Sequence, residues 1–333
     1  MAVQRRGTIF PSKDFDAAKA AQALWKAVDG IGTDETAIIN IVSSCNNQQR
    51  QDIKQEFLKY YRKDLVKEFK SELQIRLAFD FKQLLLSLFM TPAEFDANCL
   101  KASTKGLGTD EKTLVEVLLT KTADELSHVR TQYMQKFKTS LEDDVADDTS
   151  GDFRKFVYPL SRAKRSSSHL VNSQKACDVA REIHTTFTEY RGTDTPRYDF
   201  IGFCCSENYR QIRTTIEEYE KLTGETITTF IDREFSGDAA SALKSAVKCA
   251  YCMPGFLAER LHKSMDGIST NDDTLIRIIV GRSEVDLADI KKEFEAKYNK
   301  SLESKIKSHT SRHFKQLLLA IVRGNADCEQ KWE

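Results

Sequence analysis

Apolar residues recur along this chain at helical spacing, and the pattern itself is repeated. The clearest copy is an eight-residue segment whose first and fifth positions are always apolar, as one buried helical face requires. The four copies cover residues 53–60, 129–136, 212–219 and 290–297. This periodicity predicts an all-α protein of four repeats. Five helices are expected in each repeat, and in the first they cover about residues 16–28, 34–44, 49–61, 64–72 and 76–89.

Two further landmarks support the same division. A Gly-x-Gly-Thr-Asp-Glu loop at residues 30–35 returns at 106–111, with weaker copies at 191–194 and 267–272. An Asp-Thr-Ser-Gly motif at 148–151 returns in altered form at 234–237 and 309–312. Internal repetition at a fixed period predicts one structural unit per copy. The expected units are an N-terminal tail 1–13, repeats 14–89, 90–161, 173–252 and 253–325, a linker 162–172 and a C-terminal tail 326–333.

Composition narrows the classes of function. The 50 Lys and Arg balance the 50 Asp and Glu, so no overall basic field favours a nucleic-acid partner. No stretch is apolar enough to span a bilayer, and residues 1–11 lack the apolar core of a signal peptide. We therefore expect a cytoplasmic protein. Its eight cysteines are expected to be reduced core thiols, although Cys249 and Cys252 leave a zinc site with His262 as a weaker alternative.

Candidate chemistry lies in a carboxylate at fixed distance from the loop. Glu72 follows Gly32 by 40 residues, and Asp148 follows Gly108 by the same distance. Glycines let a loop turn so that its carbonyls face one point, and Ca²⁺ takes about six to eight oxygens. The predicted ligands are the carbonyls of three loop residues with one acid, namely Val28, Gly30, Gly32 and Glu72 in repeat 1 and Thr104, Gly106, Gly108 and Asp148 in repeat 2.

The loop has a simpler interpretation as a tight turn before a capped helix. In that interpretation Thr33 caps the second helix, and Asp34 and Glu35 favour its N-terminal dipole. Under the calcium interpretation the protein supplies about five oxygens, so water or an outside oxygen completes the shell. A lipid phosphoryl or carboxyl oxygen suits this role. Ile31 and Leu107 at the loop tips are expected to contact the membrane, the alternative being ordinary exposed apolar residues.

Taken together, the Gly-x-Gly-Thr-Asp-Glu loop, the acid 40 residues later, the closing motif and the fourfold repeat resemble the annexins over residues 14–325. The resemblance implies a curved disc of four five-helix repeats, with the calcium loops on the convex, membrane-facing side. It also implies a secondary Ca²⁺ position at Thr33 with Glu35 and at Thr109 with Glu111. The implied function is reversible, Ca²⁺-dependent binding to phosphatidylserine-like membranes by a non-enzymatic protein that is monomeric in solution.

Repeats 3 and 4 depart from this pattern. The third loop lacks its first glycine, and Gly192 precedes Glu234 by 42 residues, which indicates a two-residue insertion. The fourth loop keeps Met265 and Gly267 as candidate ligands but has Ser269 for the second glycine and His309 for the acid. A neutral imidazole is a poor ligand for Ca²⁺. We therefore expect the calcium sites of repeats 1 and 2 to be the most occupied, that of repeat 3 weaker or absent, and the principal site of repeat 4 absent.

Other functions compete with membrane binding. Asp96, Glu116 and Arg277 match the polar lining that underlies an ion-channel role proposed for annexins, but a buried ion-pair network is the favoured interpretation. No nucleophile elbow, phosphate loop or EF-hand loop occurs, so neither catalysis nor an EF-hand sensor is predicted. The preferred lipid, lateral self-assembly on membranes and export without a signal peptide stay open.

Overall fold

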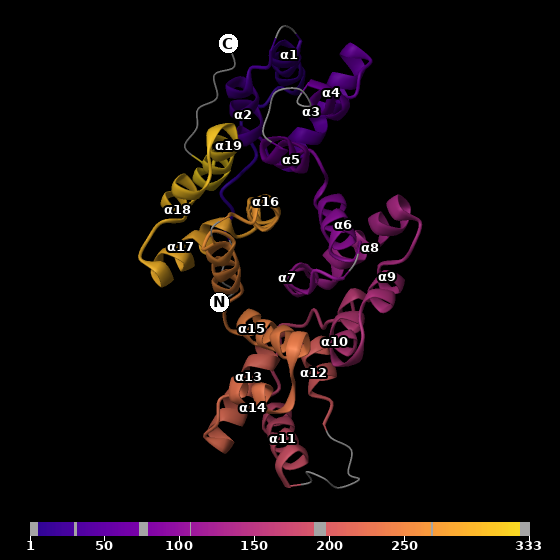
Figure 1. The fold of residues 1–333 in the computed structure, drawn as a ribbon, viewed down its shortest axis with the longest axis vertical. Helices are drawn as coiled ribbons and strands as arrows, with labels where there is room; N and C mark the ends of the chain where they lie inside the picture. Colours follow the sequence, from indigo (N-terminus) through magenta and orange to yellow (C-terminus); the bar gives the residue numbers. More distant parts are fainter. Residues whose placement is uncertain are drawn as a thin grey trace. The chain divides into compact units, whose positions relative to one another are not determined.

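The computed structural model describes residues 6–29, 32–72, 79–106, 108–189, 198–267 and 269–326, except the side chains of Glu72 and Glu189. Within these residues all regular structure is helical, which confirms the predicted all-α class (Figure 1). The chain forms two compact units. Unit 1 contains residues 1–95 and 257–333, and unit 2 contains residues 96–256.

Unit 1 holds the first and last repeats. Its helices are α1 (Ala17–Val28), α2 (Glu35–Ser44), α3 (Asn47–Tyr61), α4 (Leu65–Glu72), α5 (Phe79–Leu88), α16 (Asp272–Arg282), α17 (Leu287–Tyr298), α18 (Leu302–His309) and α19 (Arg312–Arg323). The first four helices of repeat 1 begin and end within two residues of the predicted positions. The described part of the fifth helix covers Phe79–Leu88, and the first three residues of its predicted range, 76–78, lie outside the described residues.

Unit 2 holds the middle repeats. Its helices are α6 (Pro92–Ser103), α7 (Glu111–Thr120), α8 (Ala123–Phe137), α9 (Leu141–Asp148), α10 (Gly151–Ser161), α11 (Ser173–His184), the π-helix η1 (Thr185–Glu189), α12 (Phe200–Ser206), α13 (Tyr209–Thr223), α14 (Ile227–Glu234) and α15 (Gly237–Ser264). Helices α6 and α15 cross the unit boundaries. Helix α15 is interrupted at Cys252, whose backbone is not helical, two residues before Pro254.

The third helix of each repeat supplies the core face that the sequence pattern predicts. Its two marked apolar positions are almost fully buried in all four repeats. These residues are Ile53 and Phe57, Val129 and Tyr133, Ile212 and Ile216, and Ile290 and Phe294. The fourth helix is equally regular, because it has eight residues in every repeat and ends at Glu72, Asp148, Glu234 or His309. The acid position is therefore one structural position, whichever residue occupies it.

The cap of the second helix corrects one prediction. Asp34, not Thr33, is the N-cap of α2, and its carboxylate accepts the Ala37 N–H at 2.9 Å. Asp110 caps α7 in the same way. A charged oxygen binds a free N–H at a helix start better than a hydroxyl does, and it also favours the helix dipole. The preceding threonine is therefore available to the loop.

The N-terminal tail is bound within unit 1, which the sequence did not indicate. Thr8 donates its N–H to the Ser283 carbonyl at 2.7 Å and its hydroxyl to the Ile321 carbonyl at 2.7 Å. Asn325 donates to the Phe10 carbonyl at 2.7 Å, and Ile9 is buried. A Cβ at Gly7 would meet the Ser283 oxygen at 2.6 Å, so only glycine fits there. The tail thus ties repeat 4 to the start of repeat 1.

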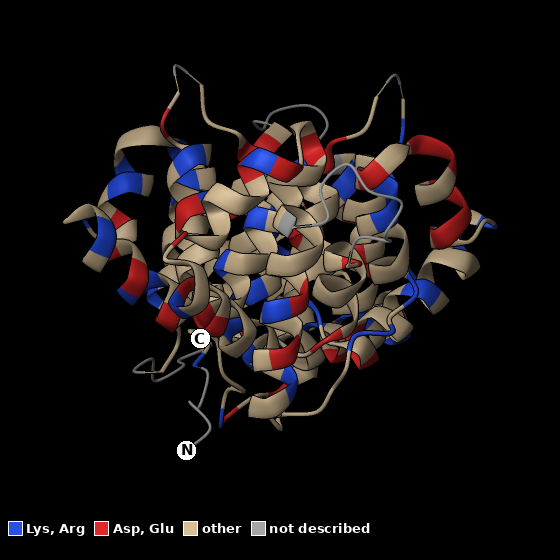
Figure 2. Ribbon diagram, turned by 90° about the horizontal axis from the view of Figure 1, so that it is seen from below, with Lys and Arg blue, Asp and Glu red and all other residues tan. Residues whose placement is uncertain are grey.

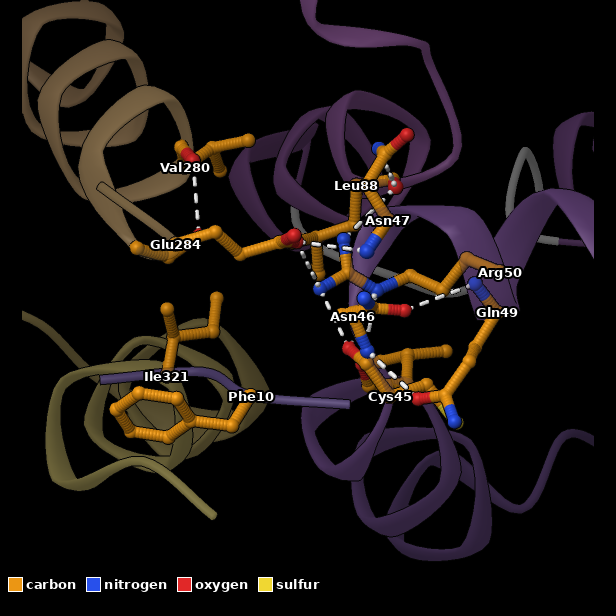
Figure 3. A network of polar contacts seen from close by, with 12 residues as sticks. Phe10, Cys45, Asn46, Asn47, Gln49, Arg50, Leu88, Val280, Glu284 and Ile321 are labelled. Carbon is orange, nitrogen blue, oxygen red and sulfur yellow. Dashed lines mark hydrogen bonds and ion pairs between the residues drawn. The ribbon is translucent and has the colours of Figure 1, made fainter. Parts of the chain in front are cut away.

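A buried arginine joins the same two repeats (Figure 3). Arg50, only 2 % exposed, donates to the carbonyls of Cys45 and Leu88 and pairs with Glu284 at 3.6 Å. Glu284 also accepts the Asn47 N–H at 2.7 Å. Burial lowers the pKa of Arg50 and raises that of Glu284, although each charge opposes the shift of the other. Removing either partner would leave a buried charge uncompensated.

Charged positions of both signs are interspersed over the helices (Figure 2). In the described part of the chain, no helix is both long and apolar enough to cross a membrane. Each unit instead packs its apolar faces internally. The repeats differ in possible ligands at two places, which are the loop between the first and second helices and the junction between the fourth and fifth.

Candidate calcium loops

The loops of repeats 1, 2 and 4 are closed by the same main-chain hydrogen bond. The N–H of the cap residue donates to the carbonyl seven positions earlier, from Asp34 to Ala27 at 2.9 Å and from Asp110 to Ser103 at 2.8 Å. In repeat 4, Asn271 donates to Ser264 at 2.7 Å. The described main chain on the two sides of each of these three loops is therefore joined at the same spacing.

Backbone conformation separates the loops of repeats 1 and 2 from that of repeat 4. Gly32, Gly106 and Gly108 have φ of 110°, 113° and 94°, a region that favours glycine. In the fourth loop, the described residues Gly267 and Ser269 do not have positive φ. The described residues of the fourth loop therefore lack the left-handed positions of the other two loops, and the Ser269 side chain disfavours such a position. Gly30, Ile31 and Leu107 lie outside the described residues.

A threonine connects the second loop to its acid. The hydroxyl of Thr109 donates to the Asp148 carbonyl at 2.9 Å, which holds the C-terminus of α9 against the loop. Thr109, Glu111 and Asp148 line one polar cleft of about 300 Å³, with Asp152 and Asp238 among its other residues. The structure thus brings together the predicted acid of the principal site and both predicted residues of the secondary site.

The electrostatics of this cleft favour a cation. The carboxylate of Asp148 is exposed at the C-terminal end of α9, where the helix dipole is negative. The cleft offers carboxylate and hydroxyl oxygens, which are the ligands hard divalent cations prefer. Among the described residues, no three His, Cys, Asp or Glu side chains are grouped as a metal site. A cation here would therefore depend on loop carbonyls as well as on Asp148.

The described part of repeat 1 matches this arrangement. Val28 is the last residue of α1, Gly32 has the left-handed conformation, and Thr33 and Glu35 flank the cap of α2. Helix α4 ends at Glu72, whose side chain lies outside the described part. The described part of repeat 1 thus shares with repeat 2 the closing hydrogen bond, a left-handed second glycine and an aspartate cap on the second helix, while Gly30 lies outside it.

The acid of repeat 3 is engaged by its neighbour. Arg233 donates to Glu234 at 2.7 Å, and the Glu234 side chain is only 2 % exposed. The first helix of this repeat continues as the π-helix Thr185–Glu189, and Asp199 caps a second helix of seven residues, three fewer than in repeats 1 and 2. Gly192 lies outside the described residues. An acid already paired and buried is a weaker cation ligand.

Repeat 4 keeps the contact but not the chemistry. The Thr270 hydroxyl donates to the His309 carbonyl at 3.0 Å, as Thr109 does to Asp148. The His309 ring nitrogen Nδ1 lies 2.9 Å from the Lys305 carbonyl. Met265 is fully buried and Gly267 is exposed. No carboxylate stands at the acid position, so this repeat lacks the charged ligand of the principal site.

The candidate pore residues have other partners or are buried. Asp96 pairs with Lys121 at 2.6 Å, and both side chains are less than a tenth exposed. Sequence reasoning missed Lys121, which has no signal beyond its charge. Glu116 is 2 % exposed, and Arg277 donates to the Thr274 hydroxyl at 3.2 Å. The seven cysteines in the described part are free thiols, and His262 stacks on Tyr298 with ring centroids 3.8 Å apart.

These features define an all-helical protein of four repeats, with a loop threonine bonded to the carbonyl of the acid position in repeats 2 and 4. A family model of the annexins matches residues 19–88, 95–160, 187–246 and 256–321. The chain belongs to the annexin family. It is 39% identical to human annexin A7 over 317 residues, which cover 95% of this chain and 64% of that protein. The chain therefore spans less than two thirds of the length of this relative.

Solved structures show the same fold. A structure of annexin III has a TM-score of 0.92 and 38% identity, covering 97% of this chain and 98% of the other. A calcium-bound structure of annexin (Sm)1 has a TM-score of 0.83 and 30% identity, covering 96% of this chain and 93% of the other. The predicted family and the four-repeat all-α fold are thus confirmed.

Proposed function

We propose that this chain binds acidic phospholipid membranes reversibly through Ca²⁺ held by the loops of repeats 1 and 2. The hydrogen bond from Thr109 to the Asp148 carbonyl carries the proposal, because it keeps the loop and the acid together. The calcium-bound form of annexin (Sm)1, a relative at 30% identity, supports Ca²⁺ as the ion. When bound, the ion supplies a positive charge that bridges a neutral protein and an acidic surface.

The proposed ligands are those predicted from the sequence. In each repeat, three loop carbonyls and one carboxylate hold the principal ion, and a threonine and glutamate of the same loop hold a secondary one. The residues are Val28, Gly30, Gly32, Glu72, Thr33 and Glu35 in repeat 1, and Thr104, Gly106, Gly108, Asp148, Thr109 and Glu111 in repeat 2. A lipid oxygen completes the shell, because these groups leave coordination positions to fill.

The four repeats contribute unequally. Glu234 is paired with Arg233, and His309 replaces the acid in repeat 4, so Ca²⁺ binds repeats 1 and 2 most tightly. A crystal grown with Ca²⁺ should show the strongest ion density beside Glu72 and Asp148. Density equally strong beside Met265 and Gly267 would contradict this asymmetry, because carbonyls and water would then suffice without an acid.

The proposed role is that of a non-enzymatic, peripheral membrane protein. A monomer with balanced charge stays in the cytoplasm until Ca²⁺ rises, since nothing else draws it to acidic lipid. Ile31 and Leu107 at the loop tips add apolar contacts with the bilayer. Organisation, trafficking or repair of membranes fits such reversible docking.

Sedimentation with vesicles tests the proposal. The chain should sediment with vesicles of phosphatidylserine and phosphatidylcholine when Ca²⁺ is present and return to the supernatant with excess chelator. Vesicles of phosphatidylcholine alone are the control for charge, and they should bind much less protein. Equal binding with and without chelator would refute a calcium bridge.

A further inference from the structure

In repeat 1, more residues of the sequence separate the described fourth and fifth helices than in the other repeats. Two residues separate these helices in repeats 2, 3 and 4. In repeat 1, α4 ends at Glu72 and α5 begins at Phe79, so six residues intervene. Residues 73–78 lie outside the described part, and Phe79 is the first described residue after them.

Phe79 is an exposed aromatic residue that the core does not need. It is 76 % exposed, whereas Phe81 two positions later is 1 % exposed and belongs to the buried face of α5. The first residue of the fifth helix is glycine in repeats 2 and 3 and arginine in repeat 4, at Gly151, Gly237 and Arg312. A phenylalanine at this position therefore leaves a large apolar surface in water without a packing reason.

The position of Phe79 within unit 1 is fixed by neighbouring contacts. Gln83, one turn along α5, donates to Asp273 at 2.5 Å, and Asp80 acts electrostatically on Asp272. Both aspartates begin α16, which directly follows the loop of repeat 4 (Figure 1). The start of α5 thus lies beside the end of the loop of repeat 4. In that repeat, His309 occupies the acid position.

We propose that Phe79 is an apolar membrane contact, which enters the interfacial region of the bilayer when the calcium loops dock. This inference rests on the proposed function. A lipid bilayer is the occupant because the start of α5 lies beside the loop of repeat 4, at the level where membrane docking is proposed. Repeat 4 also has His309 instead of a carboxylate at its acid position, so it lacks the acid that anchors Ca²⁺ in repeats 1 and 2. The neighbouring carboxylates Asp80, Asp272 and Asp273 repel acidic lipid, so the contact forms only with Ca²⁺.

Quenching by brominated lipid acyl chains tests the contact directly. The indole of the Phe79→Trp variant should be quenched on phosphatidylserine vesicles carrying these chains when Ca²⁺ is added, and chelator should reverse the effect. Leu170→Trp is the matched control, because Leu170 is 82 % exposed but lies in the linker of unit 2. Its indole should stay unquenched, and the wild-type signal gives the background from native tryptophans.

Dissociation rates give a second measurement. Phe79→Gln should leave vesicles about tenfold faster after chelator is added, because most of the burial energy of one aromatic ring is lost. Phe79→Leu should stay close to the wild type, and Leu170→Gln should have no effect. All three variants should keep the wild-type melting temperature without Ca²⁺, since both parent side chains are exposed.

The outcomes separate this inference from the function on which it rests. Failure of the wild type to sediment with Ca²⁺ would refute the proposed function. If the wild type sediments but the indole of Phe79→Trp is quenched no more than that of Leu170→Trp, the membrane contact of Phe79 is refuted and calcium docking stands. Quenching at position 79 together with faster release of Phe79→Gln would establish the contact.

Discussion

The fourth-to-fifth helix junctions of repeats 2 and 4 share a backbone and differ in charge. Each has an eight-residue helix, two extended residues and then a residue with left-handed φ, 56° at Gly151 and 51° at Arg312. In each junction, the main-chain carbonyl at the acid position accepts a hydrogen bond from the hydroxyl of a loop threonine. Yet residues 141–152 contain six acidic and no basic residues, whereas residues 302–313 contain one acidic residue, three basic residues and two histidines.

This comparison shows why one repeat can lose its ion site without losing its fold. The contact between loop and junction uses the main-chain carbonyl of Asp148 or His309, which any residue supplies. Neither side chain is buried, so the core places no packing constraint on it. Ligand identity therefore varies freely on a constant backbone.

The largest expected effect is the difference between acid positions that carry a carboxylate and the one that carries histidine. The double substitution Glu72→Gln and Asp148→Asn should raise the Ca²⁺ concentration for half-maximal vesicle binding by at least about tenfold, because each removes the only carboxylate of a principal site. His309→Asn should change it less than about twofold. Melting temperatures without Ca²⁺ should match the wild type for Asp148→Asn, whose parent side chain is exposed. A collapse of stability would make Asp148 structural.

A smaller effect is expected from restoring the fourth site. The substitutions His309→Asp and Ser269→Gly together return a carboxylate and a loop position that tolerates left-handed φ. Calorimetric titration should show one additional Ca²⁺ per chain, bound more weakly than those of repeats 1 and 2. His309→Asp alone should gain less, since the Ser269 backbone is not left-handed. An unchanged stoichiometry in the double variant would mean that further residues define the site.

Substituting the left-handed residue of the junction should change the stability of the protein by about 1 kcal/mol. Arg312 has φ of 51°, where a residue with a Cβ is strained, so Arg312→Gly should stabilise the protein by about 0.5–1 kcal/mol. Gly151→Ala imposes the opposite change at φ of 56° and should destabilise by about 1 kcal/mol. Urea unfolding followed by circular dichroism measures both. Equal effects of the same sign would show that the junctions are not equivalent.

The smallest effect concerns Asp272, the first residue of α16 after the fourth loop. Burial, followed by the charges of Asp80 and Asp273, raises the pKa of Asp272 to about 6. An acid whose pKa is higher in the folded than in the unfolded protein contributes most to the stability of the fold when the pH is below its unfolded pKa, about 3.9. That contribution is lost as the pH rises through the folded pKa of about 6.

Asp272→Asn should therefore stabilise the protein at pH 7 by less than about 1 kcal/mol, a value reduced because the side chain is partly exposed. The gain should disappear near pH 4. Thermal unfolding of both proteins at the two pH values measures it, and a gain that persists at pH 4 would have another cause than charge.

The repeated pattern of the sequence by itself determines much of this protein. Apolar positions such as Ile53 and Phe57 identify the buried face of the third helix, because a helical face depends only on local spacing. The 40-residue spacing likewise identifies Glu72 and Asp148 as equivalent, since each ends an eight-residue helix. Helix periodicity and repeat spacing are properties of the chain itself.

Only tertiary structure decided which groups meet. The sequence placed the helix cap at Thr33, but Asp34 caps α2, and the equivalent loop threonine in repeat 2, Thr109, instead bonds a carbonyl 39 residues away. No pattern indicated that the tail docks through Thr8 onto Ser283, or that Asp96 pairs with Lys121. Such partners lie far apart along the chain. They are selected by packing and burial, because a hydrogen bond or charge pair is stabilising only where the fold removes the competing water.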